Sequence, residues 1–460
     1  MTKKPEKIWT GNVRDAALTI LMAVEKQQAY SNLLLHQTIE KYNIEDKDRA
    51  LLTELTYGTI QYKMTLDYYL QPFIKGKLDD WVLQLLRLSL YQIHYLSRIP
   101  DHAAVNEAVN IAKRRGHKGI SGTVNGILRS ILREGVRSTE EIKDELERLS
   151  IETSHPLWMV KRFVSAYGFE KTAIMLKENN EPPVTTLRVN LFKRTVEQVL
   201  HLLTQEGYVV AQSEVIPECI YLFNGQAAKT TAFQKGFVTI QDESSMIPAY
   251  ALQVEPGMTV LDMCSAPGGK TTHIAEKMKN SGKLIAMDIH QHKLKLVKEN
   301  AERLGFSFIE TVEMDGRKAT EVYPEQSFDR ILVDAPCSGL GVMKRKPDIK
   351  YTKNEKDFAS LKPIQLNLLD EAYKLLKQDG LLVYSTCTVD RDENEGTAKL
   401  FLEAHPDMQL QPFPDVIKSI KEQEQEGMLQ LFPQDLRSDG FFVSVYRKAE
   451  GPLERLVTGD

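Results

Sequence analysis

Two cysteines stand where a parallel sheet would expose them to a ligand. Cys337 lies in the segment D-A-P-C-S-G (334–339), and Cys387 lies in S-T-C-T (385–388). Each segment follows an apolar run, I-L-V or L-L-V-Y, of the kind found in buried parallel strands. Because ligands bind at the carboxyl ends of such strands, we expect both thiols to line a ligand crevice.

The remaining cysteines give these two thiols a chemical context. The chain has four cysteines and no C-x-x-C pair, which argues against a disulfide framework and against a structural zinc site, so no metal is predicted. Thiols kept reduced in the cytoplasm can be reactive. Polar residues flank Cys337 and would be unfavourable in a hydrophobic core, so the two candidate thiols are expected to be reactive and not inert and buried. Cys219 is expected to be a buried structural thiol.

A second candidate site is the loop D-M-C-S-A-P-G-G-K-T (262–271), between a predicted strand and a predicted helix. Gly268 and Gly269 would let the backbone approach a ligand closely, although the spacing matches neither a P-loop nor G-x-G-x-x-G. Asp288, twenty residues beyond Gly268, ends the next predicted strand and could accept both hydroxyls of a ribose. Asp315, after the third predicted strand, could lie beside an adenine. A helix cap and a turn are the structural alternatives for these two aspartates.

The elements that must position these residues fall into three predicted parts. At 460 residues, with 42% hydrophobic and 27% charged residues, the chain is expected to be a soluble protein of two or three domains. Residues 1–145 show helical periodicity alone, 146–235 combine linker helices with a small α+β module, and 236–460 alternate strands and helices as a mainly parallel α/β sheet does. No signal peptide or membrane span is expected. Helices are predicted near 14–24, 50–60, 81–96, 103–115, 123–133, 195–203, 270–278, 292–304 and 365–377, and strands near 185–190, 258–263, 283–288, 328–333 and 381–386, with a closing hairpin at 428–446.

Charge is distributed unevenly along the chain. Residues 1–140 carry 20 Lys and Arg against 15 Asp and Glu, a balance of +5, so the remainder carries −9 of the total of −4. Within this part Lys113, Arg114, Arg115 and Lys118 form a basic concentration. It is either a solvated face or a contact for a polyanion.

In order and spacing these segments resemble the cytosine-C5 RNA methyltransferases of the Sun (Fmu) group. The helical front, from R-D-A-A-L to N-G-I-L-R (125–129), resembles the RNA-binding antitermination factor NusB. The resemblance implies a NusB-like all-α domain, a small RNA-recognition-like α+β module and a class I, Rossmann-like methyltransferase domain. The matching segments are T-L-R-V-N, Q-D-E-S-S (241–245), S-A-P-G-G-K-T, D-A-P-C-S-G, S-T-C-T and D-G-F-F (439–442).

The resemblance also implies roles for individual residues. Cys387 falls on the family's nucleophile and Cys337 on the cysteine that assists product release, and we assign Asp334 to the N3/N4 edge of the cytosine. Ser265 stands where the family usually has alanine. The family's S-adenosylmethionine contacts fall on Cys264, Ser265, Ala266, Pro267, Gly268, Gly269, Lys270, Asp288, Asp315 and Asp334.

This chemistry explains why two thiols are needed. Cytosine C5 becomes nucleophilic when a thiolate adds to C6, an acid near N3 assists this addition, and a base must then remove the C5 proton. DNA cytosine methyltransferases use the cysteine of a P-C segment, here Cys337, so the residues alone leave the assignment open. The S-T-C-T segment and the NusB-like N-terminal region resemble the RNA enzymes, and this favours Cys387 as the nucleophile.

The expected substrate is 16S ribosomal RNA before subunit assembly, bound by a cytoplasmic monomer partly through Lys113, Arg114, Arg115 and Lys118. Three alternatives remain open. Transfer RNA could be the substrate of the same catalytic segments. A non-catalytic antitermination module is disfavoured by the intact cysteines and glycine loop. DNA ranks last, because no target-recognition insertion is evident.

Overall fold

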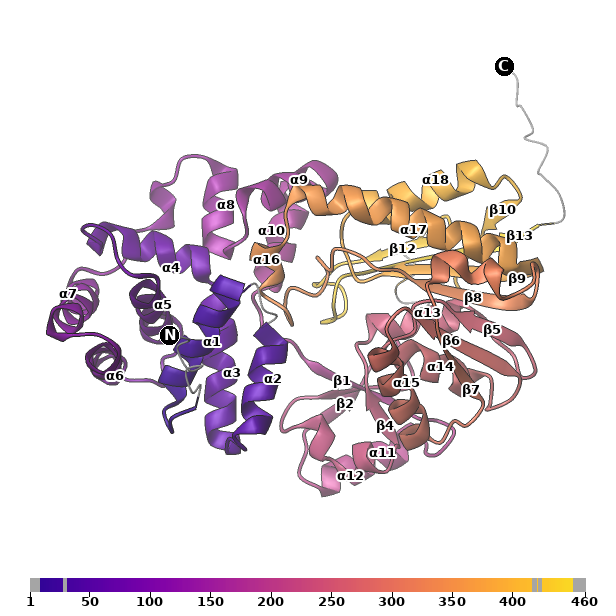
Figure 1. The fold of residues 1–460 in the computed structure, drawn as a ribbon, viewed down its shortest axis with the longest axis horizontal. Coiled ribbons are helices and arrows are strands. Elements are labelled where there is room, and N and C mark those ends of the chain that lie inside the picture. The colour runs from indigo at the N-terminus through magenta and orange to yellow at the C-terminus, as the bar shows by residue number, and fades with distance from the viewer. Residues whose placement is uncertain (1–8, 28–30, 416–419, 421–423, 450–460) are drawn as a thin grey trace, which may run out of the picture. The chain divides into compact units, whose positions relative to one another are not determined.

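The computed structural model describes residues 9–27, 31–415, 420 and 424–449 (Figure 1). By internal contacts the chain forms two compact units. One comprises 1–181 with 343–353, and the other comprises 182–342 with 354–460. No helix in the described ranges is long and apolar enough to span a membrane.

The described residues of the first unit form helices and the loops that connect them, without a strand. Leu18, Leu52, Leu86 and Leu128 come from different helices and are fully buried in one core. The five helices predicted between residues 14 and 133 are confirmed; the periodicity did not single out α2 or α4. The helices are α1 (Val13–Gln27), α2 (Ser31–Lys41), α3 (Asp46–Gln61), α4 (Lys63–Leu70), α5 (Asp80–Tyr95), α6 (Asp101–Arg115), α7 (Lys118–Glu134), α8 (Glu145–Thr153), α9 (Leu157–Tyr167), α10 (Phe169–Glu178) and α16 (Ile349–Thr352).

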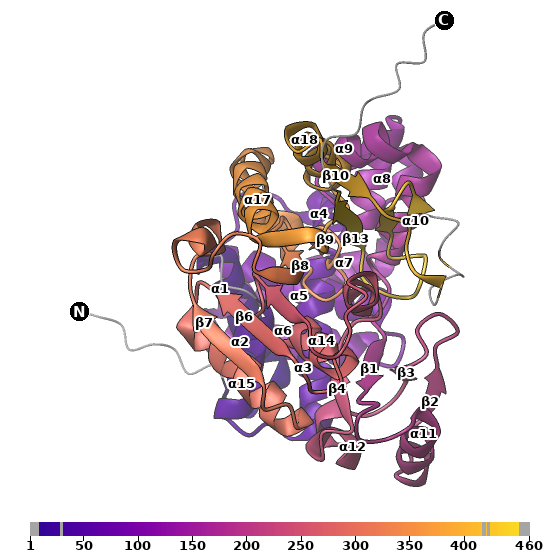
Figure 2. The same ribbon diagram turned by 90° about the vertical axis from the view of Figure 1, so that its right-hand side faces the viewer.

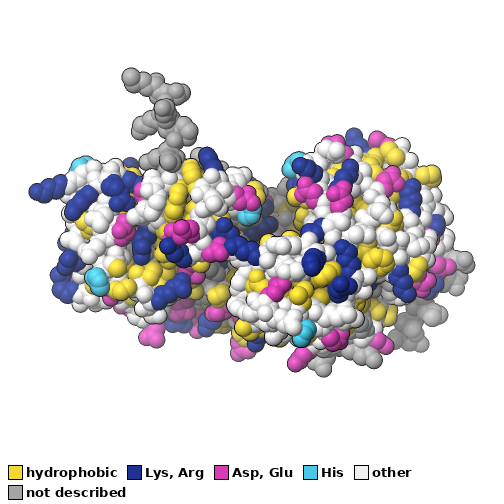
Figure 3. All heavy atoms as spheres, turned by 90° about the horizontal axis from the view of Figure 1, so that it is seen from below, with side chains coloured by type: hydrophobic (Ala, Val, Ile, Leu, Met, Phe, Trp, Pro, Cys, Tyr) yellow, Lys and Arg dark blue, Asp and Glu magenta, His cyan; other side chains and the backbone are white. Residues whose placement is uncertain are grey.

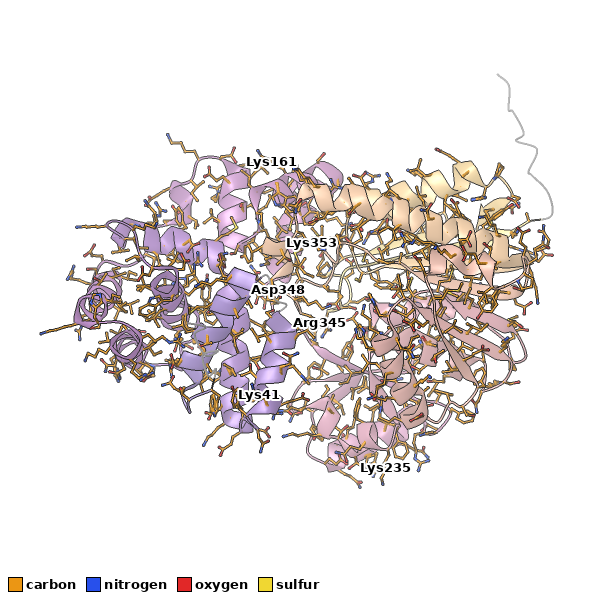
Figure 4. All side chains as sticks on the ribbon, in the orientation of Figure 1. Lys41, Lys161, Lys235, Arg345, Asp348 and Lys353 are labelled. Atoms are coloured by element: carbon orange, nitrogen blue, oxygen red, sulfur yellow. The ribbon has the colours of Figure 1, made fainter. Side chains whose placement is uncertain are left out.

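Segment 343–353, which carries α16, completes the first unit although it follows the Cys337 loop in sequence. Lys350 is fully buried, and its Nζ donates to Gln61 O at 3.1 Å and to Asn180 Oδ1 at 2.6 Å. Burial holds the pKa of Lys350 well below its ordinary value. Asp348, labelled in Figure 4, accepts a hydrogen bond from the Ser31 hydroxyl. This segment is therefore a structural part of the helical unit.

The second unit begins with a small α+β module. Its antiparallel sheet has the order β2-β3-β1-β4 and packs Leu187, Val189 and Ile220 against α11. A capping box between Thr195 and Gln198 begins α11. The elements are β1 (Thr185–Val189), α11 (Val196–Gln205), β2 (Val210–Gln212), β3 (Cys219–Leu222), α12 (Thr231–Gln234) and β4 (Val238–Ile240).

A nine-stranded mixed sheet forms the rest of the second unit (Figure 2). Its order is β11-β12-β13-β9-β8-β5-β6-β7, with β10 also paired to β13, and the strands from β9 to β7 are parallel. The predicted closing hairpin is formed by β12 and β13, and the structure shows that β13 pairs antiparallel with β9. The elements are α13 (Ile247–Ala251), β5 (Thr259–Asp262), α14 (Gly269–Lys277), β6 (Lys283–Asp288), α15 (Gln291–Leu304), β7 (Ile309–Glu313), β8 (Phe328–Asp334), α17 (Glu355–Leu375), β9 (Leu376–Thr386), α18 (Thr397–Ala404), β10 (Met408–Leu410), β11 (Glu424–Gln425), β12 (Met428–Leu431) and β13 (Phe441–Lys448).

The apolar runs of the parallel strands are explained by burial on both faces of this sheet. Val260 and Leu332 point to the core beneath α13, α14 and α15, whereas their neighbours Leu261 and Ile331 point to the core beneath α17 and α18. The two helix layers lie on opposite sides of the strands in Figure 1. The predicted fold classes are confirmed: all-α, α+β and α/β in chain order. The domain boundaries at 145 and 235 stay predictions.

Candidate active site

The residues selected from the sequence meet at the carboxyl edge of the parallel strands. The loop 263–268 follows β5, Asp288 ends β6, and Asp334 ends β8. Asp315 comes two residues after β7, and Cys387 comes directly after β9. Because neighbouring parallel strands end at the same edge, segments more than 100 residues apart in sequence form one site (Figure 1).

The two candidate cysteines are adjacent. Cys337 Sγ and Cys387 Sγ lie 3.3 Å apart, and both side chains are partly exposed. The loops that carry them are joined, because Ser338 Oγ lies 2.8 Å from Thr388 Oγ1 and Gly341 N donates to Cys387 O at 3.0 Å. A Cβ at Gly341 would come within 1.9 Å of Gly440 O, so this close approach requires glycine. The two thiols are therefore close enough to react with neighbouring atoms of one bound substrate.

A charged pair lies beside the thiols. Lys270 Nζ donates to Asp334 Oδ2 at 2.8 Å, and Ser385 Oγ donates to Asp334 Oδ1 at 2.7 Å. Burial alone would lower the pKa of Lys270, but Asp334 and, to a lesser extent, Cys387 outweigh it, so the pKa is raised. The ammonium group is therefore retained at neutral pH within electrostatic range of Cys387.

The neighbours of Cys337 disfavour its thiolate form. The hydrogen bond with Cys387, burial and the charges of Cys387 and Glu393 raise the pKa of Cys337 well above its ordinary value. Two cysteines in contact thus have different surroundings, with an ammonium group near Cys387 and a buried carboxyl near Cys337.

The loop after β5 is shaped to receive a ligand. Gly268 has φ +102°, and a Cβ there would lie 3.0 Å from Val297 Cα, so the turn requires glycine. Ser265 N donates to Met287 O at 2.8 Å, which ties the loop to β6. The Ser265 hydroxyl is buried and makes no hydrogen bond within the described part of the chain, which agrees with alanine being usual at this position.

Two carboxylates continue this loop along the edge. Asp288 Oδ1 accepts from His290 N at 2.9 Å, and Asp288 Oδ2 accepts from Ala266 N at 3.3 Å. Asp315 accepts from Arg317 Nη2 at 2.6 Å, and these bonds lower the pKa of Asp315. The turn named as the structural alternative for Asp315 is thus present, because its carboxylate also accepts from Arg317 N at 3.0 Å. The helix cap named for Asp288 is not, because the N-cap residue of α15 is His290. The arrangement also fits a cofactor with a ribose and a base, because partly exposed carboxylates end adjacent strands beside a glycine turn.

Sequence reasoning missed Arg188, which supports the loop from the small module. Arg188 is fully buried, and its Nη1 donates to Gly269 O at 2.7 Å. The same guanidinium contacts Thr272 Oγ1 at 3.0 Å and the side chain of Gln241. Two motifs, T-L-R-V-N and Q-D-E-S-S, therefore meet at the cofactor loop. The available signal was a charged residue inside an otherwise apolar strand, between Leu187 and Val189.

The basic concentration of the helical unit needs one correction. Lys113, Arg114 and Lys118 are exposed at the end of α6 and the start of α7. Arg115 instead pairs with Asp15 at 2.7 Å, and the two side chains are only 13% and 12% exposed. Its guanidinium fixes α6 to α1, so we remove Arg115 from the candidate RNA contacts. Figure 3 shows Lys and Arg side chains gathered at the left end of the view, where α6 and α7 lie.

Comparison with known proteins assigns each part of the chain a relative. Residues 249–447 match the family described as 16S rRNA methyltransferase RsmB/F. Residues 11–133 match the NusB family, and residues 155–228 match the ferredoxin-like domain of RsmF/B-like methyltransferases.

Full-length relatives extend this result. The chain is 50% identical to the probable ribosomal RNA small subunit methyltransferase B of Bacillus subtilis, over 95% of this chain and 99% of that one. It is 33% identical to the corresponding probable methyltransferase B of Synechocystis, over 95% and 100%. Among solved structures, PH0851 has a TM-score of 0.79 at 26% identity over 97% of this chain and 99% of that one. NSun6 from Pyrococcus horikoshii with SFG has a TM-score of 0.57 at 24% identity, over 63% and 97%.

Proposed function

From the premise that the chain belongs to the RsmB/F family of 16S rRNA methyltransferases, we propose that it methylates C5 of one cytosine in that RNA. The cofactor of this small-subunit rRNA methyltransferase is S-adenosylmethionine. The observation that carries the proposal is the pair of thiols 3.3 Å apart beside the Lys270–Asp334 pair. Methylation at C5 needs a nucleophile that adds to C6, an acid near N3 and a base that removes the C5 proton.

Each residue then has a defined task. The Cys387 thiolate adds to C6, the C5=C6 electron pair shifts to C4=C5, and N3 takes a proton that it shares in a hydrogen bond with Asp334. N3 gives this proton back along the same hydrogen bond after C5 has been methylated. S-adenosylmethionine, when bound, supplies the electrophilic methyl group that C5 attacks. A base then takes the C5 proton, its electron pair forms C5=C6 again, and the C6–S bond breaks to return the Cys387 thiolate.

The surroundings of the thiols support Cys387 as the nucleophile. The Lys270 ammonium favours a negative sulfur at Cys387, while a free Cys387 keeps Cys337 protonated through their hydrogen bond and charge. Once Cys387 is bonded to C6, that hydrogen bond and charge are lost. The largest cause that keeps Cys337 protonated is then removed, although burial and Glu393 still raise its pKa. Cys337 releases its proton to water at this stage and becomes the base that takes the C5 proton. The two thiols thus become active in the order that the reaction requires.

The test of the proposal is a map of modified cytosines. Deleting the gene should remove one bisulfite-resistant cytosine from 16S RNA and leave those of transfer RNA unchanged, and the intact gene should restore it. Loss of a transfer RNA cytosine instead would favour the other substrate class. Unchanged cytosines in both RNA classes would contradict C5 methylation.

We predict that Asp288→Ala weakens S-adenosylmethionine binding while RNA affinity stays nearly unchanged. Hydrogen bonds from ribose hydroxyls to a carboxylate are worth about 1.5–3 kcal/mol, which corresponds to roughly 10- to 150-fold in Kd. Calorimetry measures this change. Asp288→Asn, which keeps an acceptor for His290 N, is the matched control and should lose less affinity. Equal affinity in all three proteins would remove Asp288 from the cofactor site.

We predict that RNA affinity falls with salt and depends partly on Lys113, Arg114 and Lys118. Each phosphate contact contributes about 0.7–0.9 to the slope of log K against log salt, so replacing all three by glutamine should lower the slope by roughly 2. Filter binding of 16S RNA fragments at several salt concentrations measures it. A triple variant of exposed lysines in the second unit, Lys279, Lys295 and Lys399, is the control. Equal slopes in both variants would make the basic concentration a solvated face.

A further inference from the structure

Glu393 is a buried carboxyl group behind the Cys337 loop. It lies in the five-residue π-helix η6 (Asp392–Gly396), six residues after Cys387, and it is 1% exposed. Short π-helical segments are rare and recur at functional sites. The position of Glu393 therefore requires a physical explanation.

The contacts of Glu393 surround Cys337 on both sides along the chain. Glu393 Oε2 accepts from Ser338 N at 3.0 Å and from Gln365 Nε2 at 2.9 Å. The same Gln365 Nε2 donates to Pro336 O at 3.0 Å. One carboxyl and one amide thus hold the backbone immediately before and immediately after the thiol.

The pair is itself held from several elements. Tyr384 Oη donates to Glu393 O at 2.7 Å, and Thr397 Oγ1 donates to Gln365 Oε1 at 3.2 Å. The second carboxyl oxygen, Glu393 Oε1, is buried and makes no hydrogen bond to any residue that the structure describes. Burying such an atom is unfavourable, and burial is the main cause that raises the pKa of Glu393. Packing alone would favour an apolar side chain at this position.

We infer that Glu393 and Gln365 are positioning residues for Cys337, holding its thiol where it takes the C5 proton after methyl transfer. This inference rests on the proposed function. The step that depends on it passes the proton from C5 to the Cys337 sulfur, forms C5=C6 with the C–H electron pair, and returns the C6–S electron pair to Cys387. Addition of Cys387 and methyl transfer come earlier and do not need this alignment.

Glu393→Leu should therefore accumulate covalently bound RNA, as expected for Cys337→Ser. Denaturing gels with 16S RNA and S-adenosylmethionine show the bound fraction, and turnover should fall by about 10²-fold, as for a misplaced reacting group. Glu393→Gln keeps an oxygen acceptor for Ser338 N and should restore turnover without a trapped band. Glu395→Leu is the matched control, because that carboxylate pairs with Arg391 at 3.1 Å on the same turn and should leave turnover unchanged.

The outcomes separate this inference from the proposed function. If Cys337→Ser traps RNA and Glu393→Leu, folded and binding S-adenosylmethionine, does not, the positioning role is wrong. If Cys337→Ser itself traps nothing, its assigned role in release fails and the inference fails with it. If Glu393→Leu does not fold, Gln365→Met replaces it, because this change removes the hydrogen bond to Pro336 O. Gln365→Met should also trap RNA, and a folded variant that traps none would show that the positioning role is wrong.

Discussion

Cys387→Ser is expected to abolish methylation and to form no covalent complex with RNA. A serine hydroxyl is far less acidic than a thiol, and the nearby Lys270 ammonium cannot act as a base for it. Loss of the nucleophile should reduce turnover by more than about 10⁴-fold. The measurement combines transfer of a labelled methyl group to 16S RNA with a denaturing gel for the covalent complex.

The control for this variant is cofactor binding. Serine has nearly the same shape as cysteine, and Cys387 lies outside the cofactor loop 264–270. The affinity for S-adenosylmethionine should therefore stay within about twofold of that of the parent protein, as expected for a substitution that removes no cofactor contact. A Cys387→Ser protein that still methylates RNA, or still shifts it on a denaturing gel, would show that another residue attacks C6.

Cys337→Ser is expected to fail at a later step and to accumulate RNA bound covalently through Cys387. With the nucleophile intact, addition and methyl transfer proceed, but the group that takes the C5 proton is missing and elimination stalls. Most of the active enzyme should appear as a shifted band after one turnover. The band should depend on S-adenosylmethionine and should disappear in the double variant Cys337→Ser, Cys387→Ser.

The two variants together decide the assignment. A shifted band with Cys387→Ser and none with Cys337→Ser would reverse the roles and place the nucleophile in the P-C segment, as in the DNA enzymes. No shifted band with either variant would contradict a covalent route. Because both thiols lie within 3.3 Å of each other, position alone does not favour one of them.

Local sequence pattern determined where the strands run and where they end. Apolar runs such as I-L-V before Asp334 are buried on both faces of the sheet, so their positions in the chain were readable from residue type alone. The ends of those runs located Asp288, Asp334 and Cys387, and parallel pairing then brings such ends to one edge. The module's strand at 185–190 followed from alternation in the same way.

Tertiary structure alone decided what each of these side chains contacts. Arg115 and Lys113 are equivalent in the sequence, but only the fold places Asp15, 100 residues away, against Arg115. Likewise, the bond from Arg188 to Gly269 spans 81 residues. Hydrogen bonds and charges act over a few ångströms, and which distant segments come that close depends on how the sheets and helices pack. Residue spacing therefore located the two thiols at one edge, whereas the packing of Lys270 and Glu393 around them made Cys387 and Cys337 chemically different.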